Sequence, residues 1–200
     1  MRILLIGATG TIGSEVARAL RVDHEVVSAG RTTGDVQVDL SSPESILNMY
    51  TQVGSIDAVV SAAGSARFRP LAELSDSDYQ FSLGNKLMGQ VNLVRIGRQF
   101  VNDNGSFTLT SGVLAREPMP GSSAISMVNA GLEGFVRAAQ LELERGLRVN
   151  VVSPVWVAET LKALGRESSS GMPAAQVARA YVAAVTGNLR GAVLDVREHI

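Results

Sequence analysis

Several residue types are missing or scarce in this chain of 200 residues. It has no cysteine and only two histidines, His24 and His199. Without thiols, the chain cannot form a disulfide, a thiolate nucleophile, a zinc–thiolate site or an iron–sulfur cluster. Two imidazoles cannot build a multi-histidine metal site, and both fall away from the expected carboxyl ends of strands. The sequence therefore predicts surface roles for both histidines and no metal site.

Neither sign of charge dominates, and no apolar run is long. Eighteen Lys and Arg residues face 19 Asp and Glu residues, a net charge of −1, which provides no field for gathering nucleic acid or anionic membrane. No stretch reaches the ~18 apolar residues that indicate a membrane span. The opening run Ile3–Ile6 is too short for a secretion signal. We expect a soluble, cytoplasmic protein with a single domain over residues 1–200.

Short apolar runs alternate with segments of helical period. The expected strands are Ile3–Ile6, Glu25–Ala29, Ala58–Ser61, Ser106–Thr110, Arg148–Val152 and Ala192–Val196. The expected helices are Ile12–Leu20, Pro43–Tyr50, Asp76–Phe100, Ser123–Arg145 and Ala174–Val185. Unbroken apolar strands between helices indicate parallel strands buried on both faces. The predicted fold class is α/β, a Rossmann-type doubly wound parallel sheet flanked by helices, with ligands at the carboxyl ends of the strands.

A glycine-rich turn follows the first expected strand. It runs from Gly7 to Gly13 and includes Thr9, Gly10, Thr11 and Ile12. Gly7 permits the tight turn, Gly10 lets the backbone approach a pyrophosphate, and Gly13 packs the next helix on the sheet. Free N–H groups and the positive end of that helix then face the phosphates. This context predicts a dinucleotide site rather than an empty turn.

The end of the second expected strand bears on which dinucleotide binds. NAD-selective sites place a carboxylate there to bind the ribose 2′-hydroxyl. This chain has Arg31 and Thr32 instead, with no carboxylate before Asp35. A guanidinium binds a 2′-phosphate through forked, charge-assisted hydrogen bonds. We therefore expect NADP(H) rather than NAD(H), the alternative being that Arg31 is a solvated surface charge.

Further segments match those of a known family, in order. They are Val38–Leu40, Ile56–Gly64, Phe68–Ser75, Leu132–Phe135 and Gly146–Pro154. With the glycine turn, they make the chain resemble the short-chain dehydrogenase/reductase family over nearly its whole length. The resemblance implies an enzyme that moves hydride between a nicotinamide and a carbonyl or alcohol. It also implies cofactor contacts from Asp39, Leu40, Ala62, Ala63, Gly64, Asn129, Pro154 and Val157.

The family also commonly pairs through two long helices, which correspond here to Asp76–Phe100 and Ser123–Arg145. Such pairing buries apolar surface that a monomer leaves in water. We therefore expect a homodimer or homotetramer, which light scattering at micromolar concentration would test.

The chain departs from the family at the positions that carry its chemistry. The family uses an Asn, a Ser and a Tyr-x-x-x-Lys pair. Aligned without gaps on the flanking motifs, these positions hold Lys86, Gly112, Ile125 and Asn129. Ile125 cannot donate a proton, so membership in the family does not by itself establish the family's reaction.

Two residues are candidates to replace the missing proton donor. Lys86, one of only two lysines, falls on a vacated position and, if desolvated, would have a lowered pKa. It would then act as an acid or pair with a substrate carboxylate or phosphate, unless it reaches solvent as ordinary helix lysines do. Ser111 ends a central strand, where its hydroxyl can polarise a substrate oxygen or simply bond to backbone. Thr110, Ser123 and Ser126 are weaker candidates.

The sequence gives fewer indications of the residues that bind the substrate. Trp156, the only tryptophan, is expected on the nicotinamide side, as part of a substrate pocket or of the core. Met119, Met127, Met172, Leu161 and Leu164 either line an apolar cavity or pack in the core. Arg166–Gly171 is expected to be a mobile loop, either a substrate lid or a plain connector.

Three hypotheses remain open on the sequence. The first is an atypical NADP(H)-dependent oxidoreductase that reduces a carbonyl-type small molecule and uses Lys86, Ser111 or water as the proton source. The alternative is a non-catalytic NADP(H)-binding sensor or regulatory protein, favoured by the loss of all four family positions. Epimerisation or dehydration with a retained cofactor is a third, without a positive sign in the sequence.

Overall fold

The computed structural model describes residues 1–198, and in this part of the chain all the strands belong to one parallel sheet of seven, in the order β3-β2-β1-β4-β5-β6-β7. The strands are β1 (Arg2–Ile6), β2 (Glu25–Gly30), β3 (Val36–Gln37), β4 (Ile56–Ser61), β5 (Val101–Thr110), β6 (Arg148–Ser153) and β7 (Val193–Asp195). The chain winds outward from β1 to β3, then crosses to β4 and winds the other way. This confirms the predicted doubly wound Rossmann-type sheet.

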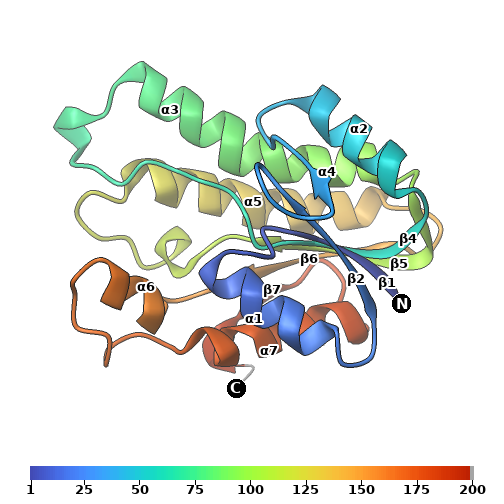
Figure 1. Ribbon diagram of the computed structural model, residues 1–200. Helices are drawn as coiled ribbons and strands as arrows, with labels where there is room; N and C mark the ends of the chain where they lie inside the picture. Colours follow the sequence, from blue (N-terminus) through green and yellow to red (C-terminus); the bar gives the residue numbers. More distant parts are fainter. Residues whose placement is uncertain (199–200) are drawn as a thin grey trace.

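Helices cover both faces of the sheet (Figure 1). They are α1 (Thr11–Leu20), α2 (Pro43–Val53), α3 (Asp76–Ser82), α4 (Gly89–Gly97), α5 (Ser123–Glu142), α6 (Ala158–Ala163) and α7 (Ala174–Thr186). α2, α4 and α5 pack on one face, and α1 and α7 pack on the other. Within residues 1–198, no helix has both the length and the apolar character to cross a membrane.

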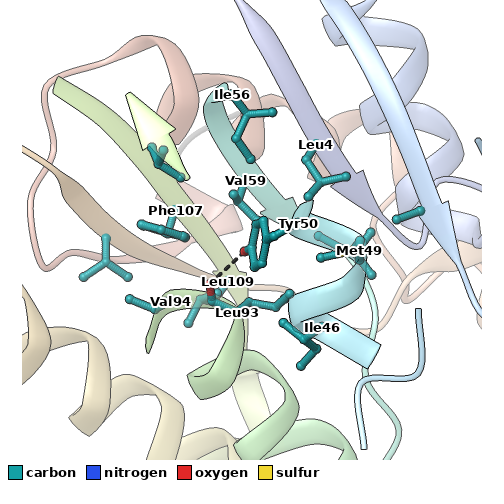
Figure 2. Close-up of a cluster of buried hydrophobic side chains, with 14 of the residues drawn as sticks. Leu4, Ile46, Met49, Tyr50, Ile56, Val59, Leu93, Val94, Phe107 and Leu109 are labelled. Atoms are coloured by element: carbon teal, nitrogen blue, oxygen red, sulfur yellow. Dashed lines mark hydrogen bonds between the residues drawn. The ribbon is translucent and has the colours of Figure 1, made fainter. Parts of the chain in front are cut away.

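Each face of the sheet has its own apolar core, because the strands are buried on both sides. On one face, Tyr50 of α2 is fully buried against Leu93 and Phe107, and its hydroxyl donates to the Leu93 carbonyl oxygen at 2.7 Å (Figure 2). On the other, Val16 of α1 and Tyr181 of α7 are fully buried. The double burial explains the continuous apolar runs in the central strands β1 and β4.

Local signals explain where the elements begin. Ser42 caps α2 by accepting a hydrogen bond from the Ser45 amide, with Pro43 in the first turn. At α3, the Ser75 side chain accepts from the Asp78 amide while the Asp78 carboxylate accepts from the Ser75 amide. This reciprocal pair satisfies two donors that a helix start leaves free.

The structure corrects the sequence at four places. The helix predicted over Ser123–Arg145 is α5, which ends at Glu142 because Leu143 adopts an extended conformation. The helix predicted over Asp76–Phe100 is α3, a π-helical turn at Leu83–Met88 and α4, which ends at Gly97. Strand β5 starts at Val101 rather than Ser106. The two-residue strand β3 and the six-residue helix α6 were not predicted, because such short elements carry too few residues to show a period.

Candidate functional site

Two cavities meet at the carboxyl ends of β1 and β4, where the winding direction of the sheet reverses. The outer cavity, of about 290 Å³, lies over the glycine turn and the end of β2. The inner cavity, of about 300 Å³, lies between the ends of β4, β5 and β6. Ala63 and Gly64 line both. The two therefore form one groove at the place where doubly wound sheets bind dinucleotides.

The glycine turn has the close packing that a phosphate cradle needs. Gly7 has φ +86°, and a Cβ there would lie 2.9 Å from the Ala62 carbonyl oxygen. A Cβ on Gly13 would collide with the Gly7 carbonyl oxygen. α1 begins after Gly10 with no side-chain cap and no acidic residue in its first turn. Its free N–H groups and positive end are thus available to an anion.

The predicted cofactor residues divide between the two cavities. The outer cavity is lined by Gly7, Thr9, Arg31, Thr32, Asp39 and Leu40. The inner cavity is lined by Ile12, Ala62, Asn129, Pro154 and Val157. Neither cavity is lined by Gly10, Thr11 or Gly13, which belong to the glycine turn and the first turn of α1.

At the outer end, Arg31 is an exposed cation with no ion pair to any residue within 1–198. The nearest carboxylate in sequence, Asp35, accepts from the Ser28 amide at 2.8 Å and from the Ser28 hydroxyl at 2.7 Å. These hydrogen bonds hold the pKa of Asp35 below its usual value. Asp35 therefore braces the end of β2, and Arg31 is left for a ligand.

Two polar residues of the outer cavity, Ser65 and Asn85, were not expected from the sequence. Thr33, which follows Arg31 and Thr32 in the chain, lines this cavity as well. The Asn85 side chain accepts from the Ser65 amide at 2.7 Å and donates to the Ser41 hydroxyl at 3.1 Å. Asn85 thus joins the loop after β4 to the start of α2. No local motif marks it, because the loops it joins are distant in sequence.

Lys86 is buried at the floor of the inner cavity. Its side chain packs beside Gly64, where an added Cβ would lie 3.2 Å from Lys86 Cγ. The ammonium donates to the Ser111 carbonyl oxygen at 3.1 Å, and it has no salt bridge to a carboxylate of residues 1–198. Burial lowers the pKa of Lys86 to about 8, because the charged form is poorly solvated there. The lysine does not reach solvent.

The π-helical turn directs two neighbouring side chains to different cavities. The Gly89 amide bonds to the Gly84 carbonyl, and within this turn Asn85 lines the outer cavity while Lys86 lines the inner one. Gln90 then fixes the turn to β5, because it donates to the Thr110 carbonyl at 2.9 Å and accepts from the Thr110 amide at 2.8 Å. Single π turns are frequent at functional sites.

Ser111 also lines the inner cavity, and its hydroxyl is hydrogen-bonded to a buried carboxylate. The hydroxyl donates to Glu133 Oε1 at 3.2 Å, and both residues are buried. Arg116 Nε lies 3.9 Å from the same carboxylate oxygen, and Arg116 Nη2 lies 3.0 Å from Asp195 Oδ2. In this arrangement, the Ser111 hydroxyl donates to Glu133. The backbone carbonyl of Ser111 accepts from the Lys86 ammonium and so orients it.

The other three residues that the sequence alignment placed at the family's catalytic positions meet at the same cavity. Gly112, Ile125 and Asn129 all line it. The Asn129 side-chain amide donates to the Gly112 carbonyl at 3.5 Å, and a Cβ on Gly112 would lie 3.0 Å from Asn129 Nδ2. Asn129 Oδ1 is buried and has no hydrogen-bond partner among residues 1–198. A buried acceptor without a donor is costly, so this oxygen fits a ligand hydroxyl.

The wall of the inner cavity differs from part of the sequence expectation. Trp156 lines it, together with Val113, Leu114 and Val155. The five methionines and leucines considered for this role do not; Met127 and Leu164 are 42% and 61% exposed, because they lie on surfaces that face away from the sheet. Of the weaker hydroxyl candidates, Thr110 lines the cavity and Ser123 and Ser126 do not.

His24 takes no part in this site. His24 lies at the opposite end of the strands, with Nδ1 2.7 Å from the Asp23 carbonyl oxygen. His199 lies outside the described residues. Within the described chain, no group of three or more His, Cys, Asp or Glu side chains gathers as metal ligands would.

Comparison with known sequences agrees with this fold. Residues 8–188 match the family model described as enoyl-(acyl carrier protein) reductase. Hydroxynaphthalene reductase arp2 of Aspergillus fumigatus is 27% identical over 150 residues, which are 72% of this chain and 55% of that protein. The 2,3-dihydro-2,3-dihydroxybenzoate dehydrogenase of Escherichia coli is 30% identical over 149 residues, 66% of this chain and 60% of that one. The chain thus matches only 55–60% of the length of these curated relatives.

Solved structures match over the whole chain. The protein lin1944 from Listeria innocua superposes with a TM-score of 0.95 and 43% identity, covering 98% of this chain and 99% of that one. A small-chain dehydrogenase in complex with NADPH superposes with a TM-score of 0.86 and 25% identity, covering 98% and 95%. The sheet order, the glycine turn and the matched family model together show that the chain belongs to the short-chain dehydrogenase/reductase family.

Proposed function

We propose that the protein is an NADP(H)-dependent oxidoreductase that reduces a carbonyl-type small molecule, with Lys86 as the proton donor in place of the family tyrosine. The observation that carries this proposal is the buried Lys86 ammonium at the floor of the inner cavity, next to the dinucleotide groove. Its pKa of about 8 lies near neutral pH, where a general acid is both protonated and able to give up its proton.

The groove offers a partner for each part of NADP(H). The N–H groups at the glycine turn would hold the pyrophosphate. Arg31 and Thr32 would bind the 2′-phosphate, and Asp39 and Leu40 would lie at the adenine. The unpartnered Asn129 Oδ1 would accept from a hydroxyl of the nicotinamide ribose. The structural neighbour in complex with NADPH supports this choice of cofactor. When bound, the cofactor supplies the hydride.

The protein's own residues would then manage the proton. As the carbonyl carbon is reduced, negative charge develops on its oxygen, and the Lys86 ammonium gives that oxygen a proton. The Ser111 carbonyl holds Nζ in place, so Ser111 acts on the reaction through Lys86. A direct role for the Ser111 hydroxyl stays a prediction, and it requires the hydroxyl to turn away from Glu133. The apolar wall of Leu114, Ile125 and Val155 excludes water.

The test is NADPH oxidation over a panel of aldehydes, ketones, enones and imines. Lys86→Met should lower kcat by about 100-fold or more, since a positioned general acid contributes roughly 10²–10⁴-fold, while the Kd for NADPH stays near the wild-type value. Wild-type kcat should fall as pH rises through about 8, because the ammonium loses its proton there. Lys162→Met, at the exposed second lysine, is the matched control and should leave the rates unchanged.

Two results would contradict the proposal in different ways. If NADPH binds and no compound of the panel is reduced, the regulatory alternative is favoured. If Lys86→Met keeps full kcat and the same pH profile, the protein is an enzyme whose proton comes from elsewhere.

A further inference from the structure

The charge carried by the side chains that line the inner cavity is of one sign, positive. Among its lining residues Lys86 is the charged one, and none is acidic. Its ammonium carries three donors, and one hydrogen bond, to the Ser111 carbonyl, engages it within residues 1–198. Most of the remaining wall is apolar. A cavity with this lining repels cations and favours ligands that carry negative charge.

A second cation stands beside the wall of this cavity. The Arg166 guanidinium lies 5.3 Å from the centroid of the Trp156 ring, and Trp156 lines the cavity. The Phe68 ring packs edge-on against the same indole, with the ring centroids 6.1 Å apart. Trp156 thus connects Arg166, from the segment after α6, with Phe68, from the loop after β4.

Arg166 is held by its backbone and free at its side chain. Its amide donates to the carbonyl of buried Leu161 at 2.9 Å, whereas its exposed guanidinium has no hydrogen bond or ion pair to residues 1–198. The cation–π contact of an exposed arginine is worth about 0.5–1 kcal/mol. A ligand anion can therefore recruit the guanidinium at little cost.

The acidic residues of the same segment do not neutralise it. Glu159 accepts from the Ala174 amide with both carboxylate oxygens, at 3.0 and 3.2 Å. Glu167 accepts from the Ser169 hydroxyl at 2.7 Å. Both carboxylates accept hydrogen bonds within the segment, which leaves Arg166 as a positive group without an ion pair to residues 1–198, beside the Trp156 ring that lines the cavity.

We propose that the substrate is an acidic carbonyl compound, whose carboxylate or phosphate is bound by Arg166 beside Trp156 while its carbonyl oxygen faces Lys86. The proposal rests on the proposed function and adds the class of substrate to it. Guanidinium binds either anion through paired, charge-assisted hydrogen bonds. A cavity of about 300 Å³ shared with the nicotinamide restricts the substrate to a small molecule, so the anion lies only a few bonds from the carbonyl.

Binding can be tested without turnover, because Trp156 is the only tryptophan and reports on the cavity wall by its fluorescence. With NADP⁺ bound, the protein is titrated with cyclohexanecarboxylate, cyclohexyl phosphate and the neutral cyclohexanecarboxamide. The wild type should bind one of the anions at least about 10-fold tighter than the amide, as expected for a charge-assisted hydrogen-bond pair, and the tighter anion identifies the group.

Arg166→Gln should remove most of that preference, and Arg166→Lys should restore part of it. Arg179→Gln, at an exposed arginine of α7, is the matched control and should keep the wild-type preference. The same variants are then compared in NADPH oxidation with an oxo acid and its amide, where Arg166→Gln should raise KM for the acid far more than it changes kcat.

Three outcomes of the binding measurements would overturn the inference: equal affinity of the wild type for anions and amide, loss of anion binding in Lys86→Met but not in Arg166→Gln, or weaker NADP⁺ binding in Arg166→Gln. The last would assign Arg166 to the cofactor. Reduction of neutral carbonyl compounds alone would overturn the inference and leave the proposed function intact. Anion binding through Arg166 without reduction of any compound would overturn the proposed function, and the acidic substrate with it, and would leave Arg166 as an anion-binding residue only.

Discussion

Lys86 gives the sharpest prediction, because the same burial that suits it for catalysis should destabilise the fold. Its ammonium is buried beside one carbonyl oxygen, without a carboxylate of residues 1–198 to balance it. Lowering its pKa from 10.5 to about 8 corresponds to a cost of about 3 kcal/mol for keeping it charged in the folded state. Lys86→Met keeps an unbranched side chain that is one atom shorter and removes the charge. It should therefore raise the free energy of unfolding at pH 7 by about 3 kcal/mol.

The sign of the pH dependence follows from the same values. Below pH 8 the lysine is protonated in both the folded and the unfolded chain, so the cost is present in full. Between about 8 and 10.5 the unfolded chain binds more protons than the folded one, so the stability of the wild type rises with pH. At pH 9.5 the advantage of Lys86→Met should shrink to about 1 kcal/mol.

Urea unfolding at pH 7 and pH 9.5, followed by Trp156 fluorescence and circular dichroism, measures both values. Lys162→Met is the control, and this exposed substitution should change stability by no more than about 0.5 kcal/mol. The reasoning is refuted if Lys86→Met is less stable than the wild type at pH 7, or if its advantage is the same at both pH values. Either result would mean that the buried ammonium is well solvated or paired in the folded protein.

Three further predictions concern the groove and the charge network behind it. Gly13→Ala places a methyl group against the Gly7 carbonyl. This overlap should lower the free energy of unfolding by about 1–3 kcal/mol, as measured by urea unfolding. It should also weaken NADPH binding by at least about tenfold, as measured by NADPH fluorescence. Arg31→Gln should lower the preference for NADPH over NADH by about 10- to 100-fold, and an equal loss for both cofactors in Kd measurements would contradict its role at the 2′-phosphate. The Arg197 hydrogen bonds lower the pKa of Asp195 from 3.8 to about 2. This carboxylate therefore stabilises the fold above pH 4, and the stabilisation is lost as pH falls through about 2. Asp195→Asn should lower the free energy of unfolding by about 2 kcal/mol at pH 7 and should make stability less dependent on pH between about 4 and 2.

The groove could be predicted in large part because its determinants are local. Gly7 and Gly13 are required by backbone approach, and any larger residue would collide with the turn itself. Arg31 follows its strand directly, so its place at the end of β2 comes with the register of the sheet. Trp156 was also expected near the nicotinamide side, and it lines the inner cavity.

The residues that sequence reasoning missed depend on contacts between distant segments. Asn85 joins Ser65 to Ser41, and nothing next to it in the chain indicates either partner. Arg166 becomes a candidate for anion binding only through its position beside Trp156. For the five methionines and leucines, the sequence left cavity and core open, because an apolar residue type does not say which surface it faces; none of the five lines the inner cavity.

By itself, the sequence determined the parallel sheet and the glycine turn of the dinucleotide groove, since strand burial and glycine spacing are local properties of the chain, and it already named Lys86 and Ser111 as candidates for the proton donor. Only the tertiary structure decided the surroundings of these two residues. Asn85 and Lys86 line different cavities, and both cavities are formed by segments that are distant from these residues in the sequence. The lowered pKa of Lys86 arises from its burial, and burial depends on the whole packed structure around a side chain.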